Sequence, residues 1–174
     1  YIPNFVDERR GLPLERSTFD TPAGAPVILA LGRLHENKGF DVLLEALSDL
    51  PDVFLWLAGE GPQKRLLTRM ANNLKVSDRV RFLGWRLDAP NLLATADALI
   101  CPSRHEPLGN VILEAWAQER PVIAAASDGP KELIQNGKNG FLCEIDNAFN
   151  LADTIQKILS DPSLASEIAR DGAT

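Results

Sequence analysis

The sequence predicts an α/β fold in which a Rossmann-like, doubly wound parallel sheet of about six strands carries helices on both faces. Short apolar runs alternate with segments of helical periodicity along most of the 174 residues, which indicates repeated strand–helix units. The runs are apolar throughout rather than at every second position, as is typical of parallel strands buried on both faces. Right-handed crossovers between such strands place helices on both sides of the sheet.

The chain divides into a short leading segment and one folded domain. Residues 1–26 are rich in Pro, Gly and charged residues and lack periodicity, so we expect an interdomain linker there. Residues 27–174 form the domain. The expected strands are residues 27–32, 53–59, 79–84, 97–103, 121–125 and 140–144. The expected helices are residues 40–50, 62–75, 90–96, 109–119, 130–136, 147–159 and 163–170.

Composition and charge argue against several classes of function. The net charge is −6 and no run of Lys or Arg occurs, so we expect no nucleic-acid partner. No apolar stretch approaches the roughly 20 residues of a membrane span, and no apolar run follows a basic start as in a signal peptide. Cys101 and Cys143 stand far apart, which favours free thiols in a reducing, cytoplasmic compartment over a disulfide. The two histidines, His35 and His105, do not suffice for a zinc site.

Five segments follow the predicted strands and form the expected ligand-binding edge, because ligands of such sheets bind beyond the carboxyl ends of the strands. These segments hold most of the glycines and several charged residues. They are residues 32–39, 59–62, 84–86, 102–110 and 126–130.

Two of these segments have features suited to a phosphate-bearing ligand. In GRLHENKG, residues 32–39, Arg33 and Lys38 share one loop and can both reach phosphate oxygens; a solvated loop with a basic pair is the alternative. In AGEGP, Gly59 and Gly61 would let a ligand approach the backbone, or they serve a tight turn before a helix. Neither loop is the Gly-rich fingerprint of nicotinamide or flavin enzymes or the phosphate loop of nucleotide triphosphatases.

The segment SRHEPLGNVILEAWA, residues 103–117, carries a stronger signal. Glu106 precedes a largely apolar helix, and Glu114 lies inside it on a narrow polar stripe with Asn110 and Gln118. A carboxylate on a largely buried helix needs a partner. If the stripe lines a cleft, Glu114 can accept hydrogen bonds from ligand hydroxyls; if it faces solvent, the helix is merely amphipathic.

The start of the same helix is suited to an anion. Backbone N–H groups at Leu108, Gly109 and Asn110 point away from the helix, and the helix dipole favours negative charge there. Together with Glu114, this arrangement would fit a diphosphate attached to a group that bears a diol.

Five motifs in order identify the chain as similar to a known family. Glu106 and Glu114 form an E-x7-E pair in EPLGNVILE, accompanied by GRLHENKG, AGEGP, FLGW and DGPKELIQNGKNG. This set resembles the C-terminal, donor-binding domain of GT-B-fold glycosyltransferases of family 4, also called group 1. IPNFVD, residues 2–7, resembles the family's crossing into that domain. The resemblance implies a nucleotide-sugar-binding domain over residues 27–174, with an N-terminal acceptor-binding domain outside this sequence.

The resemblance also implies roles for individual residues in retaining transfer of a sugar from a nucleotide diphosphate. Arg33 and Lys38 would bind the diphosphate, and Glu106 would contact the sugar hydroxyls; these three are the expected catalytic residues. Glu114 would accept the ribose hydroxyls. The other expected donor-binding residues are Leu108, Gly109, Asn110 and Val111 through backbone N–H groups, Gly59 and Gly61 at the floor, and Gly84, Trp85 and Arg86 beside the base.

Partners and alternatives follow from the same resemblance. The acceptor would be a glycan or glycolipid, as in lipopolysaccharide assembly, and the full-length protein could touch the inner membrane peripherally. No Asp-x-Asp pair occurs, so we expect no metal and no cofactor beyond the nucleotide sugar. A nucleotide-sugar-binding module without transferase activity, a related GT-B enzyme such as a nucleotide-sugar epimerase, and a non-enzymatic interaction domain are the alternatives.

Overall fold

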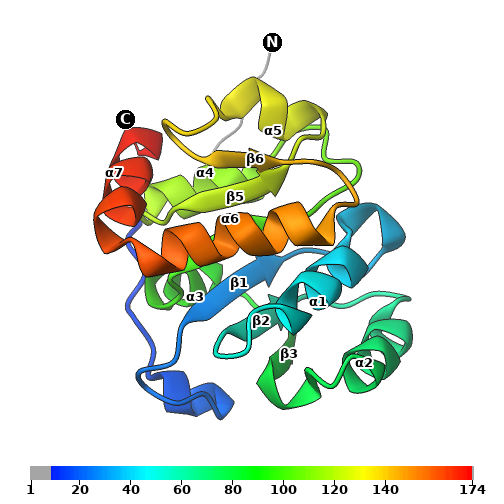
Figure 1. Ribbon diagram of the computed structural model, residues 1–174. Helices are drawn as coiled ribbons and strands as arrows, with labels where there is room; N and C mark the ends of the chain where they lie inside the picture. The colour runs from blue at the N-terminus through cyan, green and yellow to red at the C-terminus, as the bar shows by residue number, and fades with distance from the viewer. Residues whose placement is uncertain (1–8, 174) are drawn as a thin grey trace.

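The computed structural model describes residues 9–173, which contain a six-stranded parallel sheet in the order β3-β2-β1-β4-β5-β6 (Figure 1). Every strand pairing is parallel, which confirms the predicted fold class. Each of the predicted strands overlaps an observed one. The strands are β1 (Val27–Leu31), β2 (Phe54–Ala58), β3 (Val80–Gly84), β4 (Ala98–Cys101), β5 (Val122–Ala125) and β6 (Phe141–Cys143).

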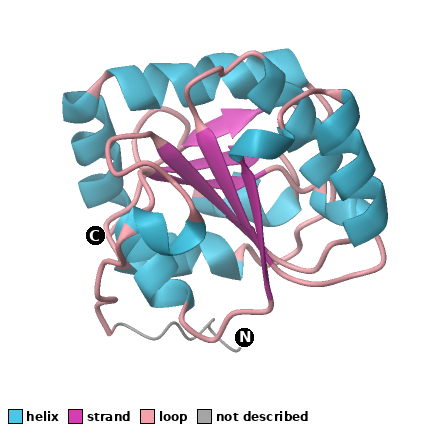
Figure 2. Ribbon diagram, turned by 90° about the horizontal axis from the view of Figure 1, so that it is seen from below, coloured by secondary structure: helices cyan, strands magenta, loops and turns pink. Residues whose placement is uncertain are grey.

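Helices cover both faces of the sheet, as Figure 2 shows with the strands enclosed between them. The α-helices are α1 (Phe40–Ser48), α2 (Lys64–Asn73), α3 (Ala89–Thr95), α4 (Asn110–Ala117), α5 (Asp128–Leu133), α6 (Ala148–Ser160) and α7 (Pro162–Gly172). Short 3-10 helices are η1 (Arg16–Phe19), η2 (Glu36–Lys38) and η3 (Ser77–Arg79). Helix α5 ends earlier than the predicted 130–136, because Asn136 and Gly140 form a bridge across a turn with Gly137 at a φ of 79°.

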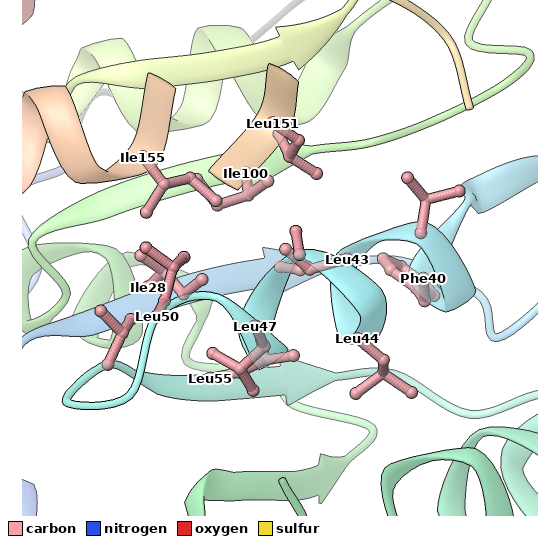
Figure 3. Packing of buried hydrophobic residues seen from close by; sticks show 14 of the residues in the cluster. Ile28, Phe40, Leu43, Leu44, Leu47, Leu50, Leu55, Ile100, Leu151 and Ile155 are labelled. Atoms are coloured by element: carbon pink, nitrogen blue, oxygen red, sulfur yellow. The ribbon is translucent and has the colours of Figure 1, made fainter. Parts of the chain in front are cut away.

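The alternation of side chains along a strand explains why β1, β2, β4 and β5 are apolar throughout. In β1, Ile28 and Ala30 join the cluster that contains residues of α1, α2 and α6. Val27 and Leu29, which point the other way, join the cluster that contains residues of α3 and α4. The sheet therefore separates two cores, and Figure 3 shows the first of them.

The first core is built largely from aliphatic side chains of the helices that lie over β1 and β2. Leu43 and Leu47 of α1 pack there with Ile155 of α6, and all three are fully buried (Figure 3). Burial of apolar area of this kind is the main favourable contribution to folding.

Residues 9–16 lie along helices α3 and α4 and form hydrogen bonds to residues in and directly after these helices. The Gly11 N–H donates to Gln118 Oε1 at 2.7 Å, the Leu14 N–H donates to Thr95 Oγ1 at 2.8 Å, and Arg16 pairs with Asp97 at 2.7 Å. A boundary at residue 26 remains a prediction. The motif at residues 2–7 lies outside the described residues.

Gln118 departs from the sequence-based expectation. It was expected on one polar stripe with Asn110 and Glu114, facing a ligand or solvent. Its side chain is instead buried, accepts from Gly11 N–H and donates to the carbonyl oxygen of Arg9. Gln118 thus holds residues 9–11 against the end of α4, and only Asn110 and Glu114 of the expected stripe remain as candidates for contact with a ligand.

No helix within residues 9–173 combines the length and the apolar character that crossing a bilayer requires.

Truncation of a core leucine should destabilise the domain strongly. We expect Leu43→Ala to lower the free energy of unfolding by about 2–5 kcal/mol, because transfer energy is lost and a cavity is left. The same change at the exposed Leu66 of α2 should cost about 0.5 kcal/mol or less. Urea denaturation of the three proteins measures both values, and equal losses at the two positions would contradict the placement of α1 over the sheet.

Candidate functional site

The loops that follow the strands meet at the carboxyl edge of the sheet and hydrogen-bond to one another. The Gly32 N–H donates to the Ala58 carbonyl oxygen at 3.0 Å, and the Gly59 N–H donates to the Gly84 carbonyl oxygen at 2.8 Å. Further along the edge, the Gly129 N–H donates to the Glu106 carbonyl oxygen at 2.8 Å. The structure thus brings together the five segments expected at the ligand-binding edge.

An ion pair between two of these loops lies at the centre of the edge. Lys38, the last residue of η2, donates from Nζ to Glu106 Oε2 at 2.5 Å. Glu106 is only 8% exposed, and a carboxylate so deeply buried is costly without a cation and hydrogen bonds. The Gly109 N–H supplies one such bond, to Glu106 Oε1 at 3.3 Å. The structure thus brings Lys38 and Glu106 into direct contact, while their expected roles toward the diphosphate and the sugar stay predictions.

The contact of Gly109 with Glu106 modifies the expected anion site at the start of α4. Gly109 precedes the helix with a φ of 67°, a left-handed conformation that favours glycine. Its N–H donates to Glu106, so it is not an open donor for a ligand in this structure. Leu108 and Asn110 beside it are exposed, and Val111 is half-buried.

Glu114 is a half-buried carboxylate without a hydrogen-bond or ion-pair partner among residues 9–173. It lies in α4, one helical turn after Asn110. Burial raises the pKa of its carboxyl group above the ordinary value of 4.5, because removal of water penalises the charged form. A ligand that donates hydrogen bonds would give the Glu114 carboxylate the partners that the described residues do not provide.

Arg33, in contrast to Lys38, is exposed and has no partner among the described residues. It follows Gly32 at the end of β1, on the same loop as Lys38. Its guanidinium is therefore available to an anion that arrives at this edge.

The glycines of AGEGP allow two loops to pack closely. A Cβ at Gly59 would lie 1.8 Å from the Gly32 carbonyl oxygen, and a Cβ at Gly61 would lie 2.4 Å from the Leu34 carbonyl oxygen. The Leu34 N–H also donates to the Glu60 carbonyl oxygen at 3.0 Å. These contacts supply a packing reason for the glycines, and their predicted place at the floor of a ligand site stays a prediction.

Residues 84–86, which follow β3 and were expected beside the base, differ in conformation, exposure and partners. Gly84 adopts a φ of 68° and Trp85 is 74% exposed. Arg86 instead forms a two-pronged ion pair with Asp88, at 2.8 and 2.7 Å, and lies over the ring of Phe19. The guanidinium of Arg86 lowers the pKa of Asp88 through these hydrogen bonds. Arg86 is thus engaged in local structure, whereas Trp85 stays open to solvent.

A separate hollow of about 370 Å³ lies at the opposite, amino edge of the sheet. Its lining includes Asp97 and Pro121, which precede β4 and β5, together with residues of α6 and α7. It contains none of the residues described above for the carboxyl edge. Among the described residues, no group of three or more His, Cys, Asp or Glu side chains is arranged to hold a metal ion, and Cys101 and Cys143 are buried free thiols.

The comparison with family models matches residues 14–174 to the family described as glycosyl transferases group 1. The chain belongs to this family. Lipopolysaccharide core biosynthesis glycosyltransferase LpsE of Rhizobium meliloti is 44% identical over 171 residues, which cover 98% of the chain and 50% of that protein. The chain thus spans about half the length of this curated relative.

Two solved structures are similar to this chain in fold and in sequence. HepE (Alr3699) of Anabaena, crystallised with UDP-glucose, is 33% identical with a TM-score of 0.87 and covers 91% of this chain and 45% of its own. The C-terminal domain of the glycosyl transferase group 1 family protein LpcC from Francisella tularensis is 26% identical with a TM-score of 0.83. The match covers 97% of this chain and 95% of the LpcC domain.

Sequence reasoning for this group 1 domain missed Arg104 and Asp41. Arg104 donates from Nη1 and Nη2 to the two Asp41 carboxylate oxygens at 2.9 and 2.7 Å, and from Nε to Asp146 at 2.6 Å. Both residues lie close in sequence to Lys38 and Glu106. The available signal was a basic residue, Arg104, after β4 and an acidic residue, Asp41, at the start of the helix that follows β1. The two are far apart in the sequence, and nothing in the sequence showed that they are in contact.

Stability should depend on pH through Glu114. The pKa of Glu114 is raised in the folded state, so between pH 4.5 and that raised pKa the folded state binds more protons than the unfolded state. The free energy of unfolding therefore falls as the pH rises through this range. We expect Glu114→Gln, which removes the charge, to be more stable than the wild type at pH 7, with the difference shrinking below pH 4.5.

Urea denaturation at several pH values measures this effect. Glu45→Gln, on the exposed side of α1, is the control and should show no such gain. A Glu114→Gln variant whose stability runs parallel to the wild type at every pH would show that burial does not disfavour the charged form.

Proposed function

We propose that this chain is the donor-binding domain of a retaining glycosyltransferase that uses a uridine diphosphate sugar. The observation that carries the proposal is Glu114, a half-buried carboxylate that no described residue satisfies. It lies on the helix that begins at the edge where the phosphate-binding candidates gather. The crystallisation of the similar HepE with UDP-glucose supports uridine as the base.

The diphosphate would bind between the loop after β1 and the start of α4. Arg33 is exposed and unpartnered within residues 9–173, and Lys38 is one-quarter exposed beside Glu106. A guanidinium can fork onto two phosphate oxygens, and an ammonium adds a mobile point charge. The dipole of α4 adds favourable potential at its N-terminus.

The hydroxyl groups of the donor would be recognised by the two glutamates. Glu114 would accept from the ribose hydroxyls, since an ionised carboxylate accepts hydrogen bonds at both oxygens. Such bonds would offset the desolvation that raises its pKa. Glu106, whose oxygens contact Lys38 and Gly109, would orient the sugar beside the diphosphate.

In the proposed reaction the acceptor's hydroxyl oxygen would bond to the sugar's anomeric carbon as the bond from that carbon to the β-phosphate oxygen breaks. The nucleoside diphosphate would leave with additional negative charge. Arg33 and Lys38 would face that charge, so they would stabilise the transition state more than the ground state. The leaving phosphate would take the proton of the acceptor hydroxyl on the same face of the sugar. With these cations supplying the charge, the reaction would need no metal.

The acceptor would be a glycan or glycolipid held by a further domain. Three observations support this: the chain spans half the length of LpsE, LpsE is named for lipopolysaccharide core biosynthesis, and the described residues of the carboxyl edge include exposed side chains such as Trp85 and Leu108. A location in the cytoplasm, with contact to the inner membrane through the longer protein, fits such an acceptor.

Calorimetric titration with UDP-glucose, UDP, GDP and ADP tests the donor site. We expect the wild-type chain to prefer the uridine nucleotides, with a Kd of roughly 10⁻⁵–10⁻³ M, which corresponds to roughly −4 to −7 kcal/mol. Arg33→Gln and Glu114→Ala should each weaken UDP-glucose binding by about tenfold or more, because each removes a charge-assisted hydrogen bond.

Matched substitutions away from the site are the controls. Arg69→Gln on α2 and Glu45→Ala on α1 change exposed residues of the same types and should leave the Kd unchanged. Equal affinity for all four nucleotides, or equal losses in site and control variants, would rule out this donor site.

A further inference from the structure

The loops that carry Lys38 and Glu106 are joined by more than the contact between those two side chains. The His105 N–H donates to the Asn37 carbonyl oxygen at 3.2 Å. Gly39, at a φ of 64°, lies so close to the neighbouring loop that a Cβ there would be 2.1 Å from the Pro102 carbonyl oxygen. Each of these contacts involves residues next to Lys38 or close to Glu106 in sequence.

Arg104 makes the most extensive connection among these loops. Its Nη1 donates to the carbonyl oxygen of Glu36 at 2.7 Å, in addition to the bonds from both terminal nitrogens to Asp41 and from Nε to Asp146. One side chain therefore joins the loop after β4 to η2, to the first turn of α1 and to the loop after β6. Each of the three guanidinium nitrogens therefore donates at least one hydrogen bond to a protein oxygen.

The electrostatics of this group favour a fixed geometry. Burial acts to raise the pKa of Asp41, but the hydrogen bonds and charge of Arg104, with backbone hydrogen bonds, outweigh it and hold that pKa below its ordinary value. Arg104 and Asp41 are each about one-third exposed on their side chains, and Asp146 takes a left-handed backbone conformation at a φ of 58°. A planar guanidinium matches a carboxylate at two points, which restricts orientation more than a single ammonium contact can.

We propose that Arg104 is a positioning residue that sets the relative placement of Lys38 and Glu106 by fastening their two loops to Asp41. It acts through those residues and does not itself bind the donor, in contrast to the unpartnered Arg33. The role in donor binding rests on the proposed function, whereas the mechanical link between the loops does not. Misplacement of binding groups by about 1 Å can cost a large factor in a well-oriented site.

Hydrogen exchange of the ligand-free chain tests the mechanical link. In Arg104→Gln we expect faster exchange of backbone amides in both residues 36–41 and residues 104–109, because loss of the bridge loosens the two loops together. Asp41→Asn should have the same effect. Arg16→Gln is the matched control: Arg16 likewise joins Asp97 and the Thr95 carbonyl oxygen, but at the amino edge, and it should leave both loops unchanged.

Ligand titration tests the consequence for the site. In Arg104→Gln the Kd for UDP-glucose should rise by about tenfold, while the Kd for UMP, which lacks the β-phosphate and the sugar, stays near the wild-type value. Arg104→Lys should resemble Arg104→Gln, because an ammonium cannot bridge the same acceptors. Arg16→Gln should change neither Kd.

The outcomes separate the two proposals. Unchanged exchange in both loops of Arg104→Gln would overturn the inference, as would full retention of UDP-glucose affinity by Arg104→Lys. Equal losses of UMP and UDP-glucose affinity would indicate general structural damage and would also overturn it. A wild-type chain that binds neither ligand would contradict the proposed function, and the exchange result alone would then decide the positioning role.

Discussion

A buried carboxylate that requires a cation beside it determines how the carboxyl edge of this sheet is built. Glu106 is almost fully excluded from water and contacts Lys38 Nζ at 2.5 Å. Removal of either partner would leave an uncompensated charge, which is far more costly than the pair itself is favourable. The loops after β1 and β4 must therefore stay close, and Arg104 with Asp41 holds them there. The candidate site depends on this approach of two loops that are far apart in sequence.

The sheet topology explains why these residues can meet at all. In the order β3-β2-β1-β4-β5-β6, strands β1 and β4 are neighbours and parallel, so their following loops leave the sheet at the same edge. Helix α4 begins directly after this edge, which brings its N-terminus beside Glu106 and carries Glu114 along the same element. One pair of adjacent strands thus assembles cations, a helix N-terminus and two carboxylates, a combination suited to a diphosphate joined to hydroxyl-bearing groups.

The fold was predictable from the sequence because β1, β2, β4 and β5 are largely buried, and alternate residues of β1 belong to different cores. The contact of Lys38 with Glu106 was within reach for the same reason, since both follow neighbouring strands. Gln118 was placed wrongly because helical periodicity shows which residues share a face but not what covers it. Arg104 was missed because its role exists only once three loops are folded together.

A crystal structure of the chain with UDP-glucose would test most directly the claim that this edge holds a nucleotide sugar. We expect ribose hydroxyls within hydrogen-bond distance of Glu114, the diphosphate against Arg33 and Lys38, and the sugar beside Glu106. A nucleotide bound instead in the hollow at the amino edge, which Asp97 and Pro121 help to line, would contradict this claim. So would a nucleotide at the carboxyl edge whose ribose makes no contact with Glu114.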